Sequence, residues 1–296
     1  MTSLTAVTYN TESGCRPGFH SHLQTFIAAN TPDVIALQEV HSAQSSNVPL
    51  TYMPKNPGKR IHPPRLQLHQ ELCKAYERDY EILFVPHLYG LHDCERGEHD
   101  VAFGQVTMIR RQTWAVSHVH SGFVFGQAHA FNTEHKEGSR GKPCSKAAIT
   151  VLMTDRANQH SVVVTNVHGF WVSRGKIDIP ERLVQNLGIA TQIKRVLEWQ
   201  DTPNVLCLGD LNYRGDMIGL EHLRSQPEFG ANGRVLNYDF DVKRTRTDYY
   251  TNWEREPEAD FMIASSPLAD STVYFKAHLD AASDHALVEA RFKLSF

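Results

Sequence analysis

The chain has 296 residues, of which 41% are hydrophobic, so it is long enough to bury a sizeable core. Its formal net charge of −3 argues against a protein that coats nucleic acid through its overall charge, and a polyanion would have to meet local patches or a bound metal. The five cysteines form no Cys-x-x-Cys pair, so neither a disulfide framework nor a zinc knuckle is expected. The N-terminus lacks a signal-peptide pattern and no apolar run is long enough to span a membrane, which predicts a soluble, cytoplasmic protein.

Short runs rich in β-branched residues recur along the chain and predict strands, because each has strand length and ends in turn-forming or polar residues. In chain order they are residues 4–9, 34–37, 81–85, 101–109, 147–153, 161–167, 204–208, 261–264, 272–277 and 286–292. Helical patterns cover residues 19–30, 66–78 and 180–199. In the last of these, apolar residues step by three or four from Leu183 through Leu187 to Leu197, which predicts one buried stripe. Helices separate only some of the strands, so the pattern indicates two mixed sheets with helices outside them.

Six of the predicted strands carry acids, amides or histidines at one end. These residues are Asn10; Gln38 and Glu39; Asn166 and His168; Asp210 and Asn212; Asp260; and Ser283, Asp284 and His285. Such side chains are costly to bury without partners. If the strand ends converge, the polar residues can partner one another around a cation.

A hard divalent cation such as Mg²⁺ prefers carboxylate and amide oxygens and takes few protein ligands. Asn10 and Glu39 are therefore the predicted metal ligands, and Asp284 is a further candidate. Singly, each of these residues is as readily explained as a turn former or a solvated side chain.

The remaining polar residues suit the hydrolysis of a phosphate ester by water. Asp210 is the candidate that orients and deprotonates the water, while His168, Asn212 and His285 are candidate donors to the charge that develops on phosphorus. Asp260 is the candidate partner that orients the imidazole of His285.

Three basic residues closely follow His168, namely Arg174, Lys176 and Arg182, and they are predicted to bind substrate phosphate. Arg182 fits a purely structural position on its helix equally well. The segment 242–253, "VKRTRTDYYTNW", combines cations with aromatic residues. Such a combination can stack nucleic-acid bases, or it can form a small core of its own loop.

The chain resembles the endonuclease/exonuclease/phosphatase superfamily, which has the DNase I-like fold. The resemblance rests on "TYN" ending at Asn10, "LQEV" with Glu39, "NVHG" with His168, "GDLN" with Asp210 and "SDH" ending at His285, together with "ADFMI" after residue 258. It spans nearly the whole chain and implies one domain over residues 1–296. It also implies an α+β fold, a four-layer α/β/β/α sandwich of two mixed β-sheets flanked by helices, and a Mg²⁺ or Mn²⁺ cofactor for cleaving phosphate esters.

The resemblance leaves the subfamily open. "GDLNYR" is similar to the inositol polyphosphate 5-phosphatases, yet their Pro-x-Trp-Cys-Asp-Arg signature is missing around Asp260. The histidine at position 168 resembles the DNase and phosphatase branches, and no motif fixes its carboxylate partner among Asp93, Glu95, Glu98 and Asp100.

The leading prediction is a nuclease-like phosphodiesterase, with nucleic acid as a candidate substrate. The alternative is a phosphatase acting on an inositol phosphate, a lipid or another small phosphate. A non-catalytic binding module would be expected to have lost several of the polar positions, and none is lost. A zinc hydrolase lacks support because His118 and His120 have no third ligand near them in sequence. The sequence makes no prediction of oligomeric state.

Overall fold

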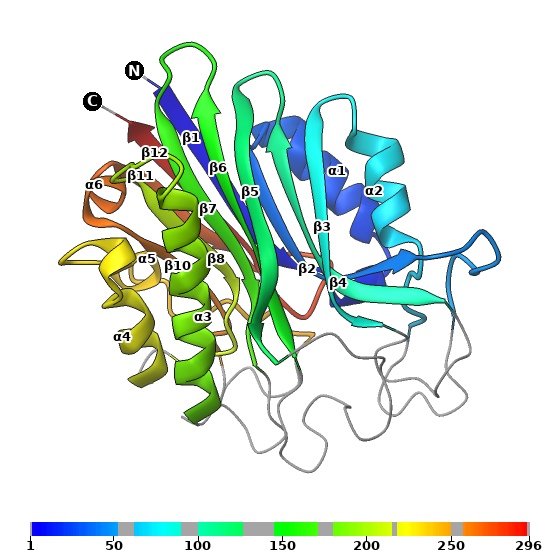
Figure 1. Cartoon of the computed structure of the whole chain (residues 1–296). Helices are drawn as coiled ribbons and strands as arrows, with labels where there is room; N and C mark the ends of the chain where they lie inside the picture. Colours follow the sequence, from blue (N-terminus) through cyan, green and yellow to red (C-terminus); the bar gives the residue numbers. More distant parts are fainter. Residues whose placement is uncertain are drawn as a thin grey trace.

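Two sheets of six strands each lie face to face in the computed structural model of the chain (Figure 1). The structure describes residues 2–52, 62–89, 100–126, 145–170, 180–214, 218–249 and 257–294. In spatial order the first sheet consists of β11 (Thr272–His278), β12 (Leu287–Leu294), β1 (Thr2–Asn10), β2 (Val34–Ala43), β4 (Val101–Arg110) and β3 (Tyr80–Tyr89). The second consists of β5 (Trp114–Phe125), β6 (Lys146–Asp155), β7 (Ser161–His168), β8 (Val205–Asp210), β10 (Asp260–Ala264) and β9 (Arg234–Val235). Both sheets are mixed, since β1 pairs with β2, and β7 with β8, in parallel.

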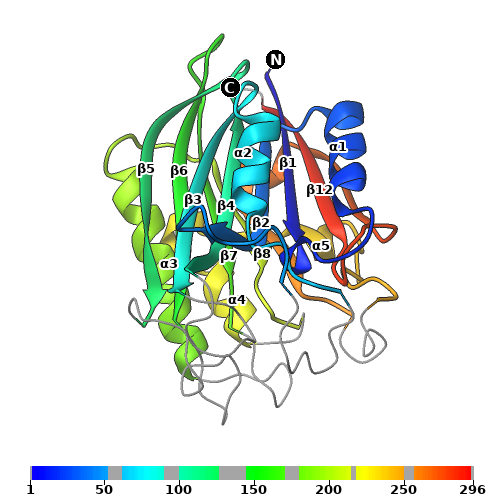
Figure 2. The same ribbon diagram turned by 90° about the vertical axis from the view of Figure 1, so that its right-hand side faces the viewer.

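Helices cover the outer faces of both sheets (Figure 2). The first sheet carries α1 (Phe19–Asn30) and α2 (Leu68–Tyr76), and the second carries α3 (Pro180–Leu197) and α4 (Ile218–Arg224). The shorter helical segments are Glu12–Gly14, Pro227–Phe229, α5 (Leu236–Asp239) and α6 (Ser266–Asp270). The predicted four-layer α/β/β/α sandwich is therefore confirmed. Among the described residues, no helix is both long and apolar enough to cross a membrane.

Strand alternation divides the apolar residues among three cores. In β1, Leu4 and Ala6 face the core between the sheets, whereas Val7 and Tyr9 face the outer helices. In β8, Leu206 and Leu208 likewise face inward, whereas Val205 and Cys207 pack beneath α3. Continuing the same alternation to the strand ends turns Asn10 and Asp210 toward the space between the sheets.

A layer of buried amides joins the sheets just beneath these strand ends. The Nε2 amide of Gln38 in β2 donates to Oδ1 of Asn166 in β7 at 2.8 Å, and Asn166 in turn donates to the carbonyl of Val106 in β4 at 2.9 Å. Gln105 of β4 donates across the interface to the carbonyl of Ala147 in β6 at 2.8 Å. Because each of these side chains is fully buried and hydrogen-bonded, the layer fixes how one sheet sits on the other.

The structure contains elements that the sequence patterns did not predict, namely β5, β9, α4, α5 and α6, and it differs from the prediction in the buried face of α3. The edge strand β5 was not predicted, because its apolar residues are separated by histidines, serines and a glycine. In α3 the predicted apolar stripe is wrong at its N-terminal end: Leu183 and Leu187 are 39% and 52% exposed. The buried side of that part of the helix is polar instead, with Gln185 hydrogen-bonded to the backbone of Phe170.

Gly209, directly before Asp210, has a backbone conformation and a packing environment that only glycine accommodates. Its φ is +150°, and a Cβ there would lie 1.9 Å from the carbonyl oxygen of Val167 on β7. We expect Gly209→Ala to lower the free energy of unfolding by about 2 kcal/mol or more, because both strain and overlap must be relieved. Urea denaturation measures this loss.

Gly230→Ala is the matched control, because Gly230 also has a positive φ of +73° but open space around its Cβ position. We expect it to cost about 1–3 kcal/mol through the backbone alone, because its φ of +73° is combined with a ψ of −176°, which side chains rarely adopt, and we expect Gly209→Ala to cost more. Equal losses for the two variants would show that the contact between β7 and β8 does not require a glycine.

Candidate active site

Strand register brings three of the predicted catalytic residues together in the second sheet. Parallel pairing of β7 with β8 sets His168 opposite Asp210, and antiparallel pairing of β10 with β8 sets Asp260 opposite the same residue. The parallel strands end, and the antiparallel strand begins, at this end of the sheet. All three side chains are at most 2% exposed. Residues separated by 42 and 50 positions in the sequence thus become neighbours through backbone pairing alone.

The first sheet contributes Asn10 and Glu39. Asn10 is the last residue of β1, and Glu39 lies at a bulge of β2 with a φ of +59°, which turns its side chain out of the strand's regular alternation. The Nδ2 amide of Asn10 donates to Glu39 Oε1 at 3.2 Å and to Asp210 Oδ2 at 2.9 Å. One amide therefore links carboxylates from the two sheets.

Two imidazoles approach the Asp210 carboxylate. His285 Nδ1 lies 2.9 and 3.1 Å from the two oxygens of Asp260, so the predicted partners are in contact. His285 Nε2 is 3.6 Å from Asp210 Oδ2. His168 Nε2 is 3.8 Å from the same oxygen and 4.0 Å from Glu39 Oε1. The carboxylates and imidazoles therefore surround one point, as the sequence predicts.

Asn212 lies in the turn directly after β8, in a left-handed backbone conformation, and its Nδ2 donates to the carbonyl of Gly169 at 3.5 Å. Its φ is +53°, and its backbone N–H donates to Asp210 Oδ1 at 3.0 Å. Its side-chain oxygen Oδ1 is buried without a hydrogen-bond partner in the part of the chain that the structure describes. Buried acceptors normally have partners, so this oxygen points to a ligand, such as a metal-bound water or a substrate group.

Asp284 lies on the rim of the site rather than at its centre. Its side chain is 21% exposed, its Oδ1 is 3.7 Å from His285 Nε2, and its backbone N–H donates to Glu12 Oε2 at 3.2 Å. Burial, followed by the negative charges of Glu12 and Asp284, raises the pKa of the nearby Tyr9 hydroxyl. The side chain of Asp284 already faces a cation, because its Oδ2 accepts from Arg246 Nη1 at 3.2 Å.

The residues present fit a hard divalent cation. Glu39 Oε1 and Asp210 Oδ2 both accept from Asn10 Nδ2, so oxygens from the two carboxylates lie close together. Asn212 Oδ1, which has no partner among the described residues, is a further acceptor, whereas Asn10 Oδ1 accepts from the Glu12 N–H at 3.0 Å. The potential ligand atoms of Asp210, Asp260 and His285 also lie within 4.8 Å of one another and could hold a metal. We favour the Glu39 side, because the bonds between Asp260 and His285 already engage that aspartate's carboxylate.

Of the three residues predicted to bind phosphate, the structure describes only Arg182. Arg174 and Lys176 lie outside the described residues. Arg182 is 1% exposed, and its Cζ lies 5.0 Å from the ring centre of Tyr213. Tyr213 directly follows Asn212 in the sequence. Contact of these three residues with substrate stays a prediction. Of the candidate partners of His168, Asp100 is exposed and the other three lie outside the described residues.

Arg246 is a site residue that the sequence reasoning missed. It is 4% exposed, its Nη1 donates to Asp284 Oδ2 at 3.2 Å, and the same nitrogen contacts His285 Nε2. The segment 244–247, "RTRT", alternates in the manner of a strand, which was the available signal that alternate side chains point inward.

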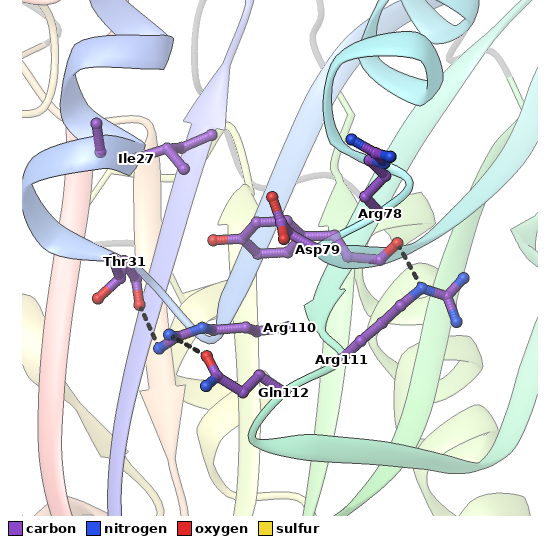
Figure 3. A pocket seen from close by; sticks show the side chains of 9 residues that line it. Ile27, Thr31, Arg78, Asp79, Arg110, Arg111 and Gln112 are labelled. Atoms are coloured by element: carbon purple, nitrogen blue, oxygen red, sulfur yellow. Dashed lines mark hydrogen bonds between the residues drawn. The ribbon is translucent and has the colours of Figure 1, made fainter.

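A separate hollow of about 720 Å³ lies at the opposite end of the first sheet, and Figure 3 shows it from close by. Its lining includes Arg78, Arg110 and Arg111, but none of the strand-end residues described above. Arg110 is hydrogen-bonded to Gln112, and Arg111 pairs with Glu81, so two of these cations already have local partners. The candidate catalytic residues therefore lie outside this hollow.

The chain belongs to the endonuclease/exonuclease/phosphatase family, whose family model matches residues 7–293. The family is one of hydrolases that act on phosphate esters and depend on divalent metals. The superfamily suggested by the sequence is thus confirmed. No curated protein matches the chain.

Solved structures share the fold. An endonuclease/exonuclease/phosphatase from Bacteroides vulgatus is 16% identical with a TM-score of 0.62, covering all of both chains. The human Nocturnin catalytic domain with bound sulfate is 11% identical with a TM-score of 0.64, covering 99% of this chain and 94% of the other. A mannosyl-6-phosphatase from Bacteroides thetaiotaomicron is 11% identical with a TM-score of 0.64, covering 99% of this chain and all of the other. At these identities the likeness concerns the fold alone.

Proposed function

We propose that this protein is a metal-dependent phosphoesterase of the nuclease-like, phosphodiester-cleaving kind, formed as one domain over residues 1–296. The observation that supports the proposal most strongly is the double hydrogen bond of Asn10. It joins Glu39 and Asp210 across the two sheets, beside two imidazoles whose Nε2 atoms are within 4.0 Å of these carboxylates. A hydrolytic site needs a base, a cation site and donors to the phosphoryl oxygens together, and this cluster offers a candidate for each.

Each residue has a role that follows from its contacts. Asp210 is buried and held by two N–H donors, so its carboxylate can orient a water molecule and accept its proton. His168 and the side-chain nitrogen Nδ2 of Asn212 would donate hydrogen bonds to phosphoryl oxygens, while Asn212 Oδ1 would accept from a metal-bound water. Glu39 and the side-chain oxygen of Asn10 would hold Mg²⁺ or Mn²⁺, with Asp284, which also pairs with Arg246, contributing from the rim. The ion would supply Lewis-acid stabilisation of the charge on the phosphoryl group.

An aromatic side chain beside the site favours a substrate that carries a nucleobase. The guanidinium of Arg16 lies 4.8 Å from the ring centre of Tyr249, which is 56% exposed. Arg16 also pairs with Glu12, whose carboxylate accepts from the backbone N–H of Asp284. A cation beneath one face of an exposed aromatic ring leaves the other face available for stacking a base.

We expect Tyr249→Ala to raise KM for a dinucleotide about 5- to 30-fold, the equivalent of one lost stacking contact. KM for a dialkyl phosphodiester should change little, because this substrate has the same scissile group but no base to stack on the Tyr249 ring. Steady-state kinetics on both substrates make the measurement, with Tyr249→Phe as the control that keeps the ring. Equal effects of Tyr249→Ala on the two substrates would argue against stacking.

The alternative is a phosphatase acting on an inositol phosphate, a lipid or another small phosphate. The sequence "GDLNYR" at residues 209–214 and the net charge of −3 favour it, since neither is characteristic of a nucleic-acid binder. A binding module that has lost catalysis fits less well, because the described site retains its polar residues in mutual contact.

A substrate panel tests the proposal. Single- and double-stranded DNA, RNA, inositol phosphates, phospholipids and sugar phosphates are incubated with the protein in Mg²⁺, Mn²⁺ or EDTA. We expect turnover of at least one phosphodiester in either metal and none in EDTA. Turnover of monoesters alone would support the phosphatase, and metal-independent turnover would contradict the proposed chemistry.

A further inference from the structure

Arg246 lies between the segment that leads into β10 and the segment that contains His285. Its backbone forms an antiparallel bridge with that of His285, and its N–H donates to the carbonyl of Pro257 at 2.9 Å. The preceding Thr245 accepts from the N–H of Asp260 at 3.0 Å. The following Thr247 donates to the carbonyl of Ser283 at 2.6 Å. The segment is thus hydrogen-bonded both to β10 at Asp260 and to the segment before β12 that contains His285.

The contacts of His285 with Arg246 and Asp260 indicate which imidazole nitrogen carries the hydrogen. His285 Nδ1 lies against both oxygens of Asp260, so Nδ1 carries a hydrogen and donates it. Nε2 then meets Nη1 of Arg246, and a guanidinium has only donors. Nε2 is therefore the acceptor, and the imidazole is the neutral Nδ1–H form in this arrangement.

This tautomer changes the role expected of His285. A neutral ring whose Nε2 accepts from Arg246 has no hydrogen on that nitrogen to donate to a phosphoryl oxygen. The guanidinium has five N–H donors, and Nη1 already reaches both His285 and Oδ2 of Asp284 at 3.2 Å. The positive charge on this side of the site is therefore permanent and belongs to the arginine.

We propose that Arg246 donates to a non-bridging oxygen of the scissile phosphate, while Asp260 and His285 act as positioning residues that orient the guanidinium. The inference rests on the proposed function and assigns the cationic phosphate contact within that site. The carboxylate of Asp284 offsets part of the cost of burying this guanidinium, and a phosphate would add further charge-assisted hydrogen bonds. The competing explanation is that Arg246 only anchors Asp284.

Substitutions at position 246 separate these two roles. Glutamine can still donate hydrogen bonds to Asp284 and His285 but carries no charge, whereas lysine keeps the charge without the planar fork. Lys243→Gln is the matched control, because Lys243 lies in the same segment with its side chain 79% exposed and pairs only with Asp241 in the described part of the chain. Thermal unfolding is measured for each variant to confirm that it is folded.

We expect Arg246→Gln to lower kcat about 10²- to 10³-fold, the effect of removing one oxyanion donor. Arg246→Lys should retain more activity than Arg246→Gln, and Lys243→Gln should match the wild type. Inorganic phosphate, titrated calorimetrically in EDTA, should bind Arg246→Gln at least about 10-fold more weakly than the wild type, because the contact is charge-assisted and independent of metal.

Wild-type kcat and phosphate affinity in Arg246→Gln would overturn the inference and leave the anchor role. If Arg246→Gln does not fold, Arg246→Lys decides the question. An unchanged kcat in Arg246→Lys would overturn the inference, since a phosphate-binding fork is not replaced by an ammonium without loss. A wild-type protein inactive on the whole substrate panel would instead contradict the proposed function, whatever the phosphate titration shows.

Discussion

Asp210→Asn should lower kcat about 10³- to 10⁴-fold while the protein stays folded, because the substitution removes the proposed general base from the centre of the site. Asp210 accepts hydrogen bonds from the Asn10 amide at 2.9 Å and from the Asn212 N–H at 3.0 Å. An asparagine offers only one acceptor oxygen, so it can satisfy only one of these donors. We therefore also expect a loss of about 1–3 kcal/mol in the free energy of unfolding.

The measurement is single-turnover hydrolysis with saturating metal, combined with urea denaturation of both proteins. Asp201→Asn is the matched control, because it makes the same chemical change at an exposed position shortly before β8. An Asp210→Asn variant that retains a tenth or more of the wild-type kcat would place the base elsewhere.

Glu39→Gln should produce the second large effect, through the metal. Removing a carboxylate from a site for a hard cation lowers both the charge and the ligand strength, and we expect the Mg²⁺ concentration for half-maximal rate to rise about 10²-fold. Glu39 is 21% exposed and its carbonyl accepts from Thr11 at 3.0 Å, so its backbone at the bulge does not depend on the carboxylate.

Titration of the rate with Mg²⁺ and calorimetric binding of Mn²⁺ both report this change. Glu221→Gln serves as the control, because Glu221 is 51% exposed and pairs with Arg224 on α4. An unchanged metal requirement in Glu39→Gln, with normal folding, would move the metal site toward the cluster of Asp210, Asp260 and His285.

The convergence of the site could be predicted because strand geometry is periodic. Side chains two residues apart share a face, so polar residues at the ends of buried strands point into one space between the sheets. Asn10, His168, Asp210 and Asp260 obey this rule, and the structure brings them into contact. The partnership of Asp260 with His285, inferred from side-chain chemistry, is likewise present.

Features that depend on contacts between distant segments could not be read from the sequence. The bulge that redirects Glu39 is created by the pairing of β2 with β4, and no local residue pattern marks it. The role of Arg246 depends on a segment that docks on His285 from 39 positions away. The polar inner side of α3 arises because Arg182 packs over Tyr213, whereas a helical pattern predicts an apolar face there.

The central claim is that side chains from both sheets hold one divalent ion beside Asp210 and His285. Diffraction from crystals soaked in Mn²⁺ and inorganic phosphate, recorded at the manganese absorption edge, tests it most directly. We predict an anomalous peak at coordination distance from the Glu39 carboxylate, with phosphate between that ion and His168. A manganese ion bound away from Glu39 and Asp210, or a phosphate bound only at another surface, would contradict the account.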